Sequence, residues 1–216
     1  MREEIIRVIR EKKLIVIVRG VKREQLIPLG EAVFKGGARL IELTYDPSGK
    51  VSDEEMADNV RLMAEHFKGR MHIGSGTVLS PLQVEMTKKA GGEFIVSPDV
   101  CPEVIKRTIE LDMVSLPGAM TPTEIAGASR LGADFIKLFP AGTLGPAYVK
   151  AVLAPLNNVE ILGVGGIDAD NLPAYLKAGL KGLGVGSNIV KKELLEKEDY
   201  EEITALTRAF AEGVLK

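Results

Sequence analysis

Lys137 is the residue whose type and setting point most directly to chemistry. It lies within Phe135-Ile136-Lys137-Leu138-Phe139, an apolar stretch in which burial of an ammonium group is costly. An amine attacks a ketone and forms a Schiff base when desolvation and nearby positive charge lower its pKa from the usual value of about 10.4. A Schiff base is an electron sink for making or breaking a C–C bond. The other interpretation is a lysine that snorkels toward solvent or pairs with a carboxylate.

Glu42 is a second charged residue inside an apolar stretch. It interrupts Leu40-Ile41-Glu42-Leu43-Thr44, and strand alternation puts it on the face of Leu40 and Thr44. If that face is interior, the carboxyl group stands with Lys137. It can then act as a general acid/base while the Schiff base forms and while a substrate hydroxyl is deprotonated. A structural ion pair with Lys137 or Arg19 is the alternative, and the pair alone does not decide between the two.

Two glycine clusters, Gly165-Gly166 and Gly186-Ser187, favour phosphate binding. Their backbone amides allow a phosphate to approach closely, and we expect the helix N-terminus that follows to add positive potential. The loops after strands seven and eight are the recurrent phosphate site of (β/α)8 barrels, which is where both clusters fall. No Gly-x-Gly-x-x-Gly follows the first strand, so the dinucleotide fingerprint is absent.

Short apolar runs, each followed by a helical pattern, must position these residues. Their starts are about 20–30 residues apart, the size of a strand plus a crossover helix. Runs rich in Ile, Val and Leu are typical of parallel strands covered on both faces. Eight such units predict an α/β fold, a single (β/α)8 TIM barrel over residues 1–216 with an extra N-terminal helix; a doubly wound sheet is the alternative. The predicted strands are 14–19, 40–44, 72–76, 93–97, 113–117, 134–138, 160–163 and 182–186.

Helix signals support this division of the chain. Ser52, Ser80 and Thr121 each begin a predicted capping box with Glu or Gln three residues later. Glycines at 91, 132 and 179 fall where helices should end with a positive φ. We therefore interpret the three hydroxyl residues as structural.

The composition excludes several classes of function. With 28 Lys+Arg against 30 Asp+Glu the formal net charge is −2, whereas nucleic acids are bound by concentrated basic charge. The single cysteine, Cys101, cannot form an internal disulfide, which fits a reducing cytosol. Residues 1–7 mix charges and lack the apolar core of a signal peptide, and no apolar run approaches the roughly 20 residues that span a bilayer. We expect a soluble, cytoplasmic protein without a nucleic-acid or membrane partner.

Taken together, the motifs resemble the 2-keto-3-deoxy-6-phosphogluconate / 4-hydroxy-2-oxoglutarate aldolase family. The resemblance covers nearly the whole chain. It is carried by Ile41-Glu42-Leu43-Thr44, Gly74-Ser75-Gly76-Thr77-Val78-Leu79, Ile95-Val96-Ser97-Pro98, Pro117-Gly118, Ile136-Lys137-Leu138-Phe139-Pro140, Val164-Gly165-Gly166-Ile167 and Gly184-Val185-Gly186-Ser187. It implies a class I, metal-independent aldolase without a cofactor. Such an enzyme cleaves a phosphorylated 2-keto-3-deoxy sugar acid to pyruvate and glyceraldehyde 3-phosphate.

The resemblance also implies roles for particular residues. Lys137 would be the Schiff-base lysine and Glu42 the acid/base. Thr77 would help to hold the pyruvate carboxylate, while Pro98 and Phe139 would line the pocket. The family is usually a homotrimer.

One position departs from the family pattern. Many members carry an arginine four residues after the catalytic glutamate, where it binds the substrate carboxylate, and here that position is Asp46. An acidic side chain pointing inward would repel a carboxylate. We therefore predict that Arg19, at the end of the first strand, supplies the cation, with Lys50 the poorer choice. The segment 45–50 is also a candidate for shifting selectivity toward a related sugar acid.

Two other functions remain open from the residues. A phosphosugar isomerase or epimerase on the same barrel would use Glu42 as base and Lys137 only as an electrostatic stabiliser. A non-catalytic phosphosugar-binding barrel would keep the two charges as a structural pair. The two histidines, His66 and His72, are isolated and lack the spacing of metal ligands, so we predict no metal site.

Overall fold

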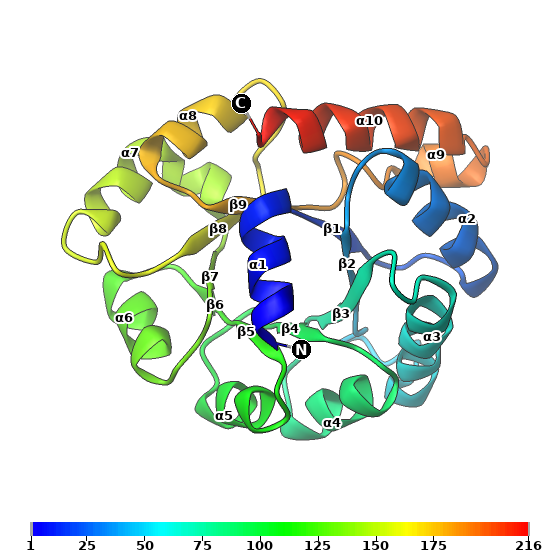
Figure 1. The fold of residues 1–216 in the computed structure, drawn as a ribbon, viewed down its shortest axis with the longest axis horizontal. Coiled ribbons are helices and arrows are strands. Elements are labelled where there is room, and N and C mark those ends of the chain that lie inside the picture. Colours follow the sequence, from blue (N-terminus) through cyan, green and yellow to red (C-terminus); the bar gives the residue numbers. More distant parts are fainter. Residues whose placement is uncertain (1, 216) are drawn as a thin grey trace.

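Parallel strands form one sheet that curves around the centre of the molecule (Figure 1). The computed structural model describes residues 2–215, and within them the sheet has nine strands in the order β5-β4-β3-β2-β1-β9-β8-β7-β6. Every neighbouring pair is parallel. The strands are β1 Leu14–Val18, β2 Leu40–Thr44, β3 His72–Gly76, β4 Phe94–Val96, β5 Val114–Leu116, β6 Gly118–Ala119, β7 Ile136–Leu138, β8 Ile161–Val164 and β9 Gly182–Val185.

The two strands at the ends of this order, β5 and β6, are separated in the chain only by Pro117. On one side, Ser97 of the chain after β4 donates its N–H to the carbonyl of Leu116; on the other, Lys137 of β7 donates to the carbonyl of Pro117. Proline has no backbone N–H to donate to a neighbouring strand, so the strand assignment is interrupted at Pro117. The carbonyl groups of Leu116 and Pro117 still bind the neighbouring strands on the two sides, so the sheet remains closed. β5 and β6 are therefore one barrel strand, and the predicted (β/α)8 barrel is confirmed.

Helices surround the sheet, and α1 lies across its centre (Figure 1). The helices are α1 Arg2–Lys12, α2 Arg23–Lys35, α3 Asp53–His66, α4 Pro81–Lys89, α5 Pro102–Glu110, α6 Pro122–Arg130, α7 Ala141–Leu153, α8 Leu172–Ala178, α9 Lys192–Glu196 and α10 Tyr200–Gly213. Among the described residues, none of these helices has the length and apolar character needed to cross a membrane.

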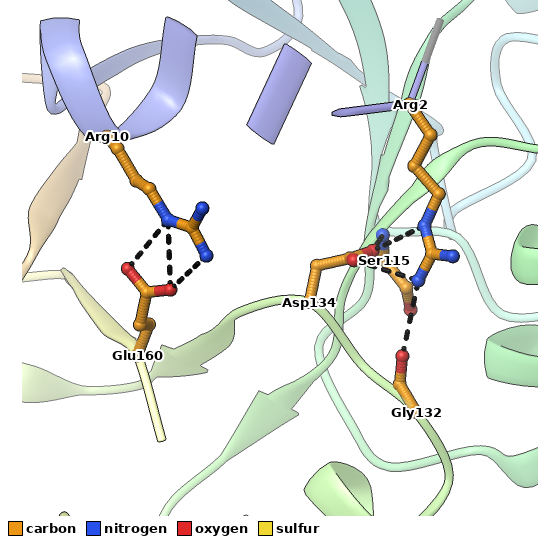
Figure 2. A network of polar contacts seen from close by, with 6 residues as sticks. All are labelled: Arg2, Arg10, Ser115, Gly132, Asp134 and Glu160. Carbon is orange, nitrogen blue, oxygen red and sulfur yellow. Dashed lines mark hydrogen bonds and ion pairs between the residues drawn. The ribbon is translucent and has the colours of Figure 1, made fainter. Parts of the chain in front are cut away.

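The predicted extra N-terminal helix, α1, closes the amino-terminal end of the barrel. Its residues Ile5, Ile6 and Ile9 are buried in one cluster with side chains from several strands, among them Leu40 and Phe94. Two arginine–carboxylate pairs hold the helix at its two ends: Arg2 with Asp134 and Arg10 with Glu160 (Figure 2). Asp134 also accepts a hydrogen bond from the backbone N–H of Ser115, which ties α1 to β5. Because α1 covers the amino-terminal end, we look for the active site at the carboxyl end of the barrel.

The predicted caps are confirmed as caps, but only one is a complete capping box. The side chains of Ser52, Ser80 and Thr121 accept hydrogen bonds from the backbone N–H three residues later. In the described part of the chain the reciprocal bond is present only at Thr121, where Glu124 accepts from the backbone of its cap. At Ser80 the side chain of Gln83 instead accepts from Leu79 N, one residue too early for a box.

The predicted strands 40–44 and 72–76 coincide with β2 and β3. The predictions 93–97, 113–117 and 134–138 extend one or two residues beyond β4, β5 and β7. Glu42 and Lys137 lie within β2 and β7, and the other predicted site residues follow the carboxyl ends of their strands.

Candidate active site

Glu42 and Lys137 face each other across the barrel interior. They come from β2 and β7, which are separated in the sheet order by β1, β9 and β8 and so lie on opposite sides of an eight-stranded barrel. Both are buried, with 2% of Glu42 and 7% of Lys137 exposed. Each side chain affects the titration of the other through its charge rather than through a hydrogen bond. The predicted juxtaposition of the two groups is thus present in the structure.

Burial favours the uncharged form of both groups. Desolvation raises the pKa of the Glu42 carboxyl, and the positive charges of Lys137 and Arg19 oppose this only in part. Desolvation also lowers the pKa of the Lys137 amine; the carboxylate of Glu42 opposes this shift and Arg19 adds to it. A neutral amine is the form that attacks a carbonyl carbon, so this environment suits a nucleophilic lysine.

Arg19 and Thr77 lie together at the mouth of the barrel. Arg19 directly follows β1 and is exposed, and its Nη2 donates a hydrogen bond of 3.2 Å to Oγ1 of Thr77, which directly follows β3. Thr77 has a φ of +56°, a conformation that is a genuine outlier for a β-branched residue. The pairing puts a cation and a hydroxyl beside the two buried groups, as a carboxylate-binding site requires.

Phe139 and Pro98 are at the same end of the barrel. The Phe139 ring centroid is 5.4 Å from the Lys137 amine nitrogen, and 46% of Phe139 is exposed. Gly165 packs against this ring, since a β-carbon built at Gly165 would lie 3.1 Å from it. Pro98 is exposed after β4, and its backbone packs against Gly118, the residue paired with Lys137. Phe139 therefore lies directly against the Lys137 amine, whereas Pro98 is separated from β7 by the strand formed by β5 and β6.

The two glycine clusters follow the neighbouring strands β8 and β9. Gly165 and Gly166 have φ values of 82° and 76°, which only glycine adopts readily. The predicted helix N-termini beside the clusters are wrong: α8 begins only at Leu172 and α9 only at Lys192. The backbone turns themselves, rather than a helix end, are the candidate phosphate-binding elements.

Two asparagines that sequence analysis missed support these turns. Asn171 donates its side-chain N–H to the carbonyl of Gly166, and Asn188 donates to the carbonyl of Ile167. The bond from Asn188 joins the turn after β9 to the turn after β8. In the sequence Asn188 directly follows the second cluster, whereas Asn171 lies five residues after Gly166.

Asp46, the departure from the family pattern, directs its carboxylate into its own loop. The carboxylate accepts from the backbone N–H groups of Ser48, Lys50 and Val51 and from the Ser48 hydroxyl. These hydrogen bonds, led by that of the Ser48 side chain, lower the pKa of the Asp46 carboxyl. Asp46 therefore organises the loop 46–51 and does not replace the missing arginine. Lys50 is exposed on that loop, so Arg19 is the better-placed cation.

A hollow of about 790 Å³ lies away from these residues, at the amino-terminal ends of β3 and β4. Its lining includes Met71, His72, Lys88 and Glu93, but neither Lys137 nor Glu42. His72 Nδ1 and Oε2 of Glu93 are in hydrogen-bond contact there, 2.8 Å apart. Within residues 2–215, no three His, Cys, Asp or Glu side chains are arranged to hold a metal ion. Because the chemistry is concentrated at the other end of the barrel, we place the candidate active site there.

A parallel (β/α)8 barrel with a buried amine and a buried carboxyl group opposed across its interior holds the two groups that Schiff-base chemistry requires. Comparison with protein-family models identifies the class more specifically. The chain belongs to the KDPG and KHG aldolase family, whose model matches residues 5–206.

Individual relatives agree with this placement. The chain is 30% identical over 202 residues to the 2-dehydro-3-deoxy-6-phosphogalactonate aldolase of Escherichia coli K12, covering 93% of this chain and 96% of that protein. It is 30% identical over 207 residues to the 2-dehydro-3-deoxy-phosphogluconate aldolase of Haemophilus influenzae, covering 95% and 94%. Its fold is similar to that of the KDPG aldolase of Legionella pneumophila with pyruvate captured as a covalent carbinolamine, with a TM-score of 0.84, 27% identity and coverage of 94% and 96%.

The protein is therefore a class I aldolase and an aldehyde-lyase. The isomerase or epimerase and the non-catalytic binding barrel, which the residues alone left open, are not favoured by these relatives.

Proposed function

We propose that the protein reversibly cleaves 2-keto-3-deoxy-6-phosphogluconate, or a closely related 2-keto-3-deoxy sugar acid such as the phosphogalactonate epimer or 4-hydroxy-2-oxoglutarate. The products are pyruvate and an aldehyde, which is glyceraldehyde 3-phosphate for the phosphorylated six-carbon acids. The observation that carries the proposal is the Lys137 amine, buried opposite Glu42 with its pKa lowered by desolvation. The names of the relatives supply the substrate class.

In the proposed reaction the neutral amine of Lys137 attacks the C2 carbonyl carbon of the substrate. The carbinolamine loses water, with a proton supplied by Glu42, and becomes a protonated imine. The Glu42 carboxylate then takes the proton of the C4 hydroxyl; the C3–C4 bond breaks, the aldehyde leaves, and the bonding electrons enter the imine as an enamine. Protonation at C3 and hydrolysis release pyruvate and restore the amine.

The remaining predicted residues bind and orient the substrate in this proposal. Arg19 and Thr77 hold the carboxylate, and their mutual hydrogen bond supports the assignment. Phe139 and Pro98 line the apolar side of the pocket. The phosphate is held by backbone N–H groups of Gly165, Gly166, Gly186 and Ser187, in the turns after β8 and β9.

Reductive trapping tests the proposal directly. The protein is incubated with pyruvate and borohydride, and the product is analysed by intact mass and by peptide mapping. We expect a single reduced-pyruvate adduct on Lys137, with every other lysine of the chain serving as an internal control. A folded protein that acquires no adduct, or acquires it at another lysine, would contradict the proposed role of Lys137.

Removing the cation at the mouth is expected to weaken binding of the carboxylate. Arg19→Ala should raise KM for the sugar acid by roughly 10- to 100-fold, because a hydrogen bond to a charged group is worth about 1.5–3 kcal/mol. Since Arg19 lowers the pKa of Lys137 by its charge, the pKa of the amine should rise in the variant. Steady-state kinetics over a pH series measure both effects.

The control for this variant is Arg208→Ala, an exposed arginine on α10. It removes the same charge far from β1 and should leave KM unchanged. An unaltered KM in Arg19→Ala would contradict the role of Arg19 as the replacement for the family arginine.

We further propose that the protein is a cytoplasmic homotrimer, as the family resemblance implies. Three large apolar side chains, Leu79, Leu82 and Met120, are exposed after β3 and β6 and would be covered by subunit contact. Light scattering coupled to gel filtration measures the number of chains per particle. A monomer at micromolar concentration would contradict the trimer.

A further inference from the structure

Gly76, the last residue of β3, leaves the space that the Glu42 carboxyl group occupies. If a β-carbon is built at Gly76, the three nearest atoms are Oε1, Cδ and Cγ of Glu42, all closer than real β-carbon contacts allow. β2 and β3 are neighbours in the sheet, with Thr44 opposite Gly76 and Glu42 opposite Gly74. The Glu42 side chain therefore lies directly against the bare Cα of Gly76.

The backbone conformation does not by itself require glycine at this position. Gly76 is a strand residue and has no positive φ, in contrast to Thr77 directly after it. An alanine would adopt the same backbone without strain. What the position excludes is a side chain, since the space is taken by the glutamate of the neighbouring strand.

The outer face of β3 is fixed, so the strand cannot easily retreat from Glu42. The fully buried side chain of Thr87 on α4 donates a hydrogen bond to the Ser75 hydroxyl and also contacts the hydroxyl of Tyr45. The backbone N–H of Tyr45 in turn donates to the carbonyl of Gly76. A methyl group added at Gly76 would therefore displace the flexible carboxyl end of Glu42 rather than the strand.

We propose that Gly76 is a positioning residue that keeps the Glu42 carboxyl group against β3, aimed across the barrel at Lys137. Only a residue without a β-carbon permits this placement. The inference rests on the proposed acid/base role of Glu42 and deepens it, because it names what holds the proton-transferring group at the required place.

The first test is the kinetics of Gly76→Ala. We expect kcat to fall by about 10²-fold, because a displacement of about 1 Å in a catalytic group has an effect of this size. KM should change little, since the residues proposed to bind carboxylate and phosphate are untouched. The matched control is Gly127→Ala on α6, where a β-carbon meets nothing within 4 Å; its kcat should equal that of the wild type.

A double-mutant cycle with Glu42→Ala shows whether Gly76 acts through Glu42. Glu42→Ala removes the three colliding atoms, so adding Gly76→Ala to it should cause no further loss of kcat. The same cycle in thermal unfolding should show that Gly76→Ala lowers Tm in the wild type but not in the Glu42→Ala background. If Gly76→Ala alone fails to fold, restoration of folding in the double variant supports the proposal equally.

Three results would overturn the inference. Wild-type kcat in Gly76→Ala, with Glu42→Ala strongly impaired, would remove Gly76 from the mechanism and leave the proposed function intact. An equal loss from Gly76→Ala with and without Glu42 would show that it acts elsewhere. Wild-type activity in Glu42→Ala would instead refute the acid/base role, and the inference with it.

Discussion

Replacement of Lys137 by alanine is expected to abolish cleavage of the sugar acid, with kcat lower by about 10⁴-fold or more, as is typical when an enzyme loses its nucleophile. Without the amine no imine can form, and the C3–C4 bond has no electron sink. The borohydride adduct with pyruvate should disappear from the variant as well. A coupled assay of aldehyde release and the intact mass of the trapped protein measure the two effects.

The fold of this variant should persist, because burying the amine of a side chain that is only 7% exposed adds an unfavourable desolvation to the native state. Circular dichroism and Tm establish this. Lys150→Ala, an exposed lysine on α7, is the matched control and should retain full activity and the adduct. Lys137→Arg keeps the positive charge but cannot form an imine, and it should be as inactive as the alanine variant. Turnover near that of the wild type in either Lys137 variant would refute the Schiff-base mechanism for this chain.

Substitution of Glu42 by glutamine should lower kcat by about 10²–10⁴-fold, the usual range of general acid–base contributions, because no other carboxyl group is proposed to act on the substrate. Glutamine has nearly the same shape, so it fits against Gly76 and the fold should be intact. KM should change little. Glu201→Gln, an exposed glutamate on α10, is the matched control. A fall confined to KM would make Glu42 a binding residue rather than an acid/base.

The pH dependence gives a second measure of the same pair. We expect a bell-shaped profile of kcat/KM, because the reactive enzyme holds one proton shared between the amine of Lys137 and the carboxyl group of Glu42. The limb at low pH, where a second proton binds and charges the Lys137 amine, should lie below the ordinary amine pKa of 10.5, since burial lowers the pKa of Lys137. The limb at high pH, where the proton of the Glu42 carboxyl group is lost, should lie above the ordinary carboxyl pKa of 4.5, since burial raises the pKa of Glu42.

In Glu42→Gln the limb at high pH should disappear, because the carboxyl proton that is lost there no longer exists. Only protonation of the Lys137 amine then limits the rate. A profile that keeps both limbs in the glutamine variant would assign the upper one to another group.

Much of the barrel could be predicted from local patterns. Strand alternation in 40–44 placed Glu42 on the same face as Leu40, and the structure buries both. The caps at Ser52, Ser80 and Thr121 depend only on residues within one turn, so they were accessible to sequence reasoning. The division of the fifth strand at Pro117 was not predicted, because it depends on which of two neighbouring strands each carbonyl faces once the barrel is closed.

The candidate site likewise has features that the sequence predicts and features that depend on the folded barrel. The sequence by itself determined that two charged side chains, Lys137 and Glu42, would be drawn into apolar strands, because hydrophobic periodicity leaves them no other face. Only the tertiary structure decided that they oppose each other across the barrel and that the charge of Arg19 affects the pKa of both. It also decided that Arg19 donates a hydrogen bond to Thr77 and that the Asp46 carboxylate binds within its own loop. It also decided that Gly76 gives Glu42 its space. These relations join residues on different strands and loops, and their distances exist only after the sheet has closed, whereas periodicity constrains each strand alone.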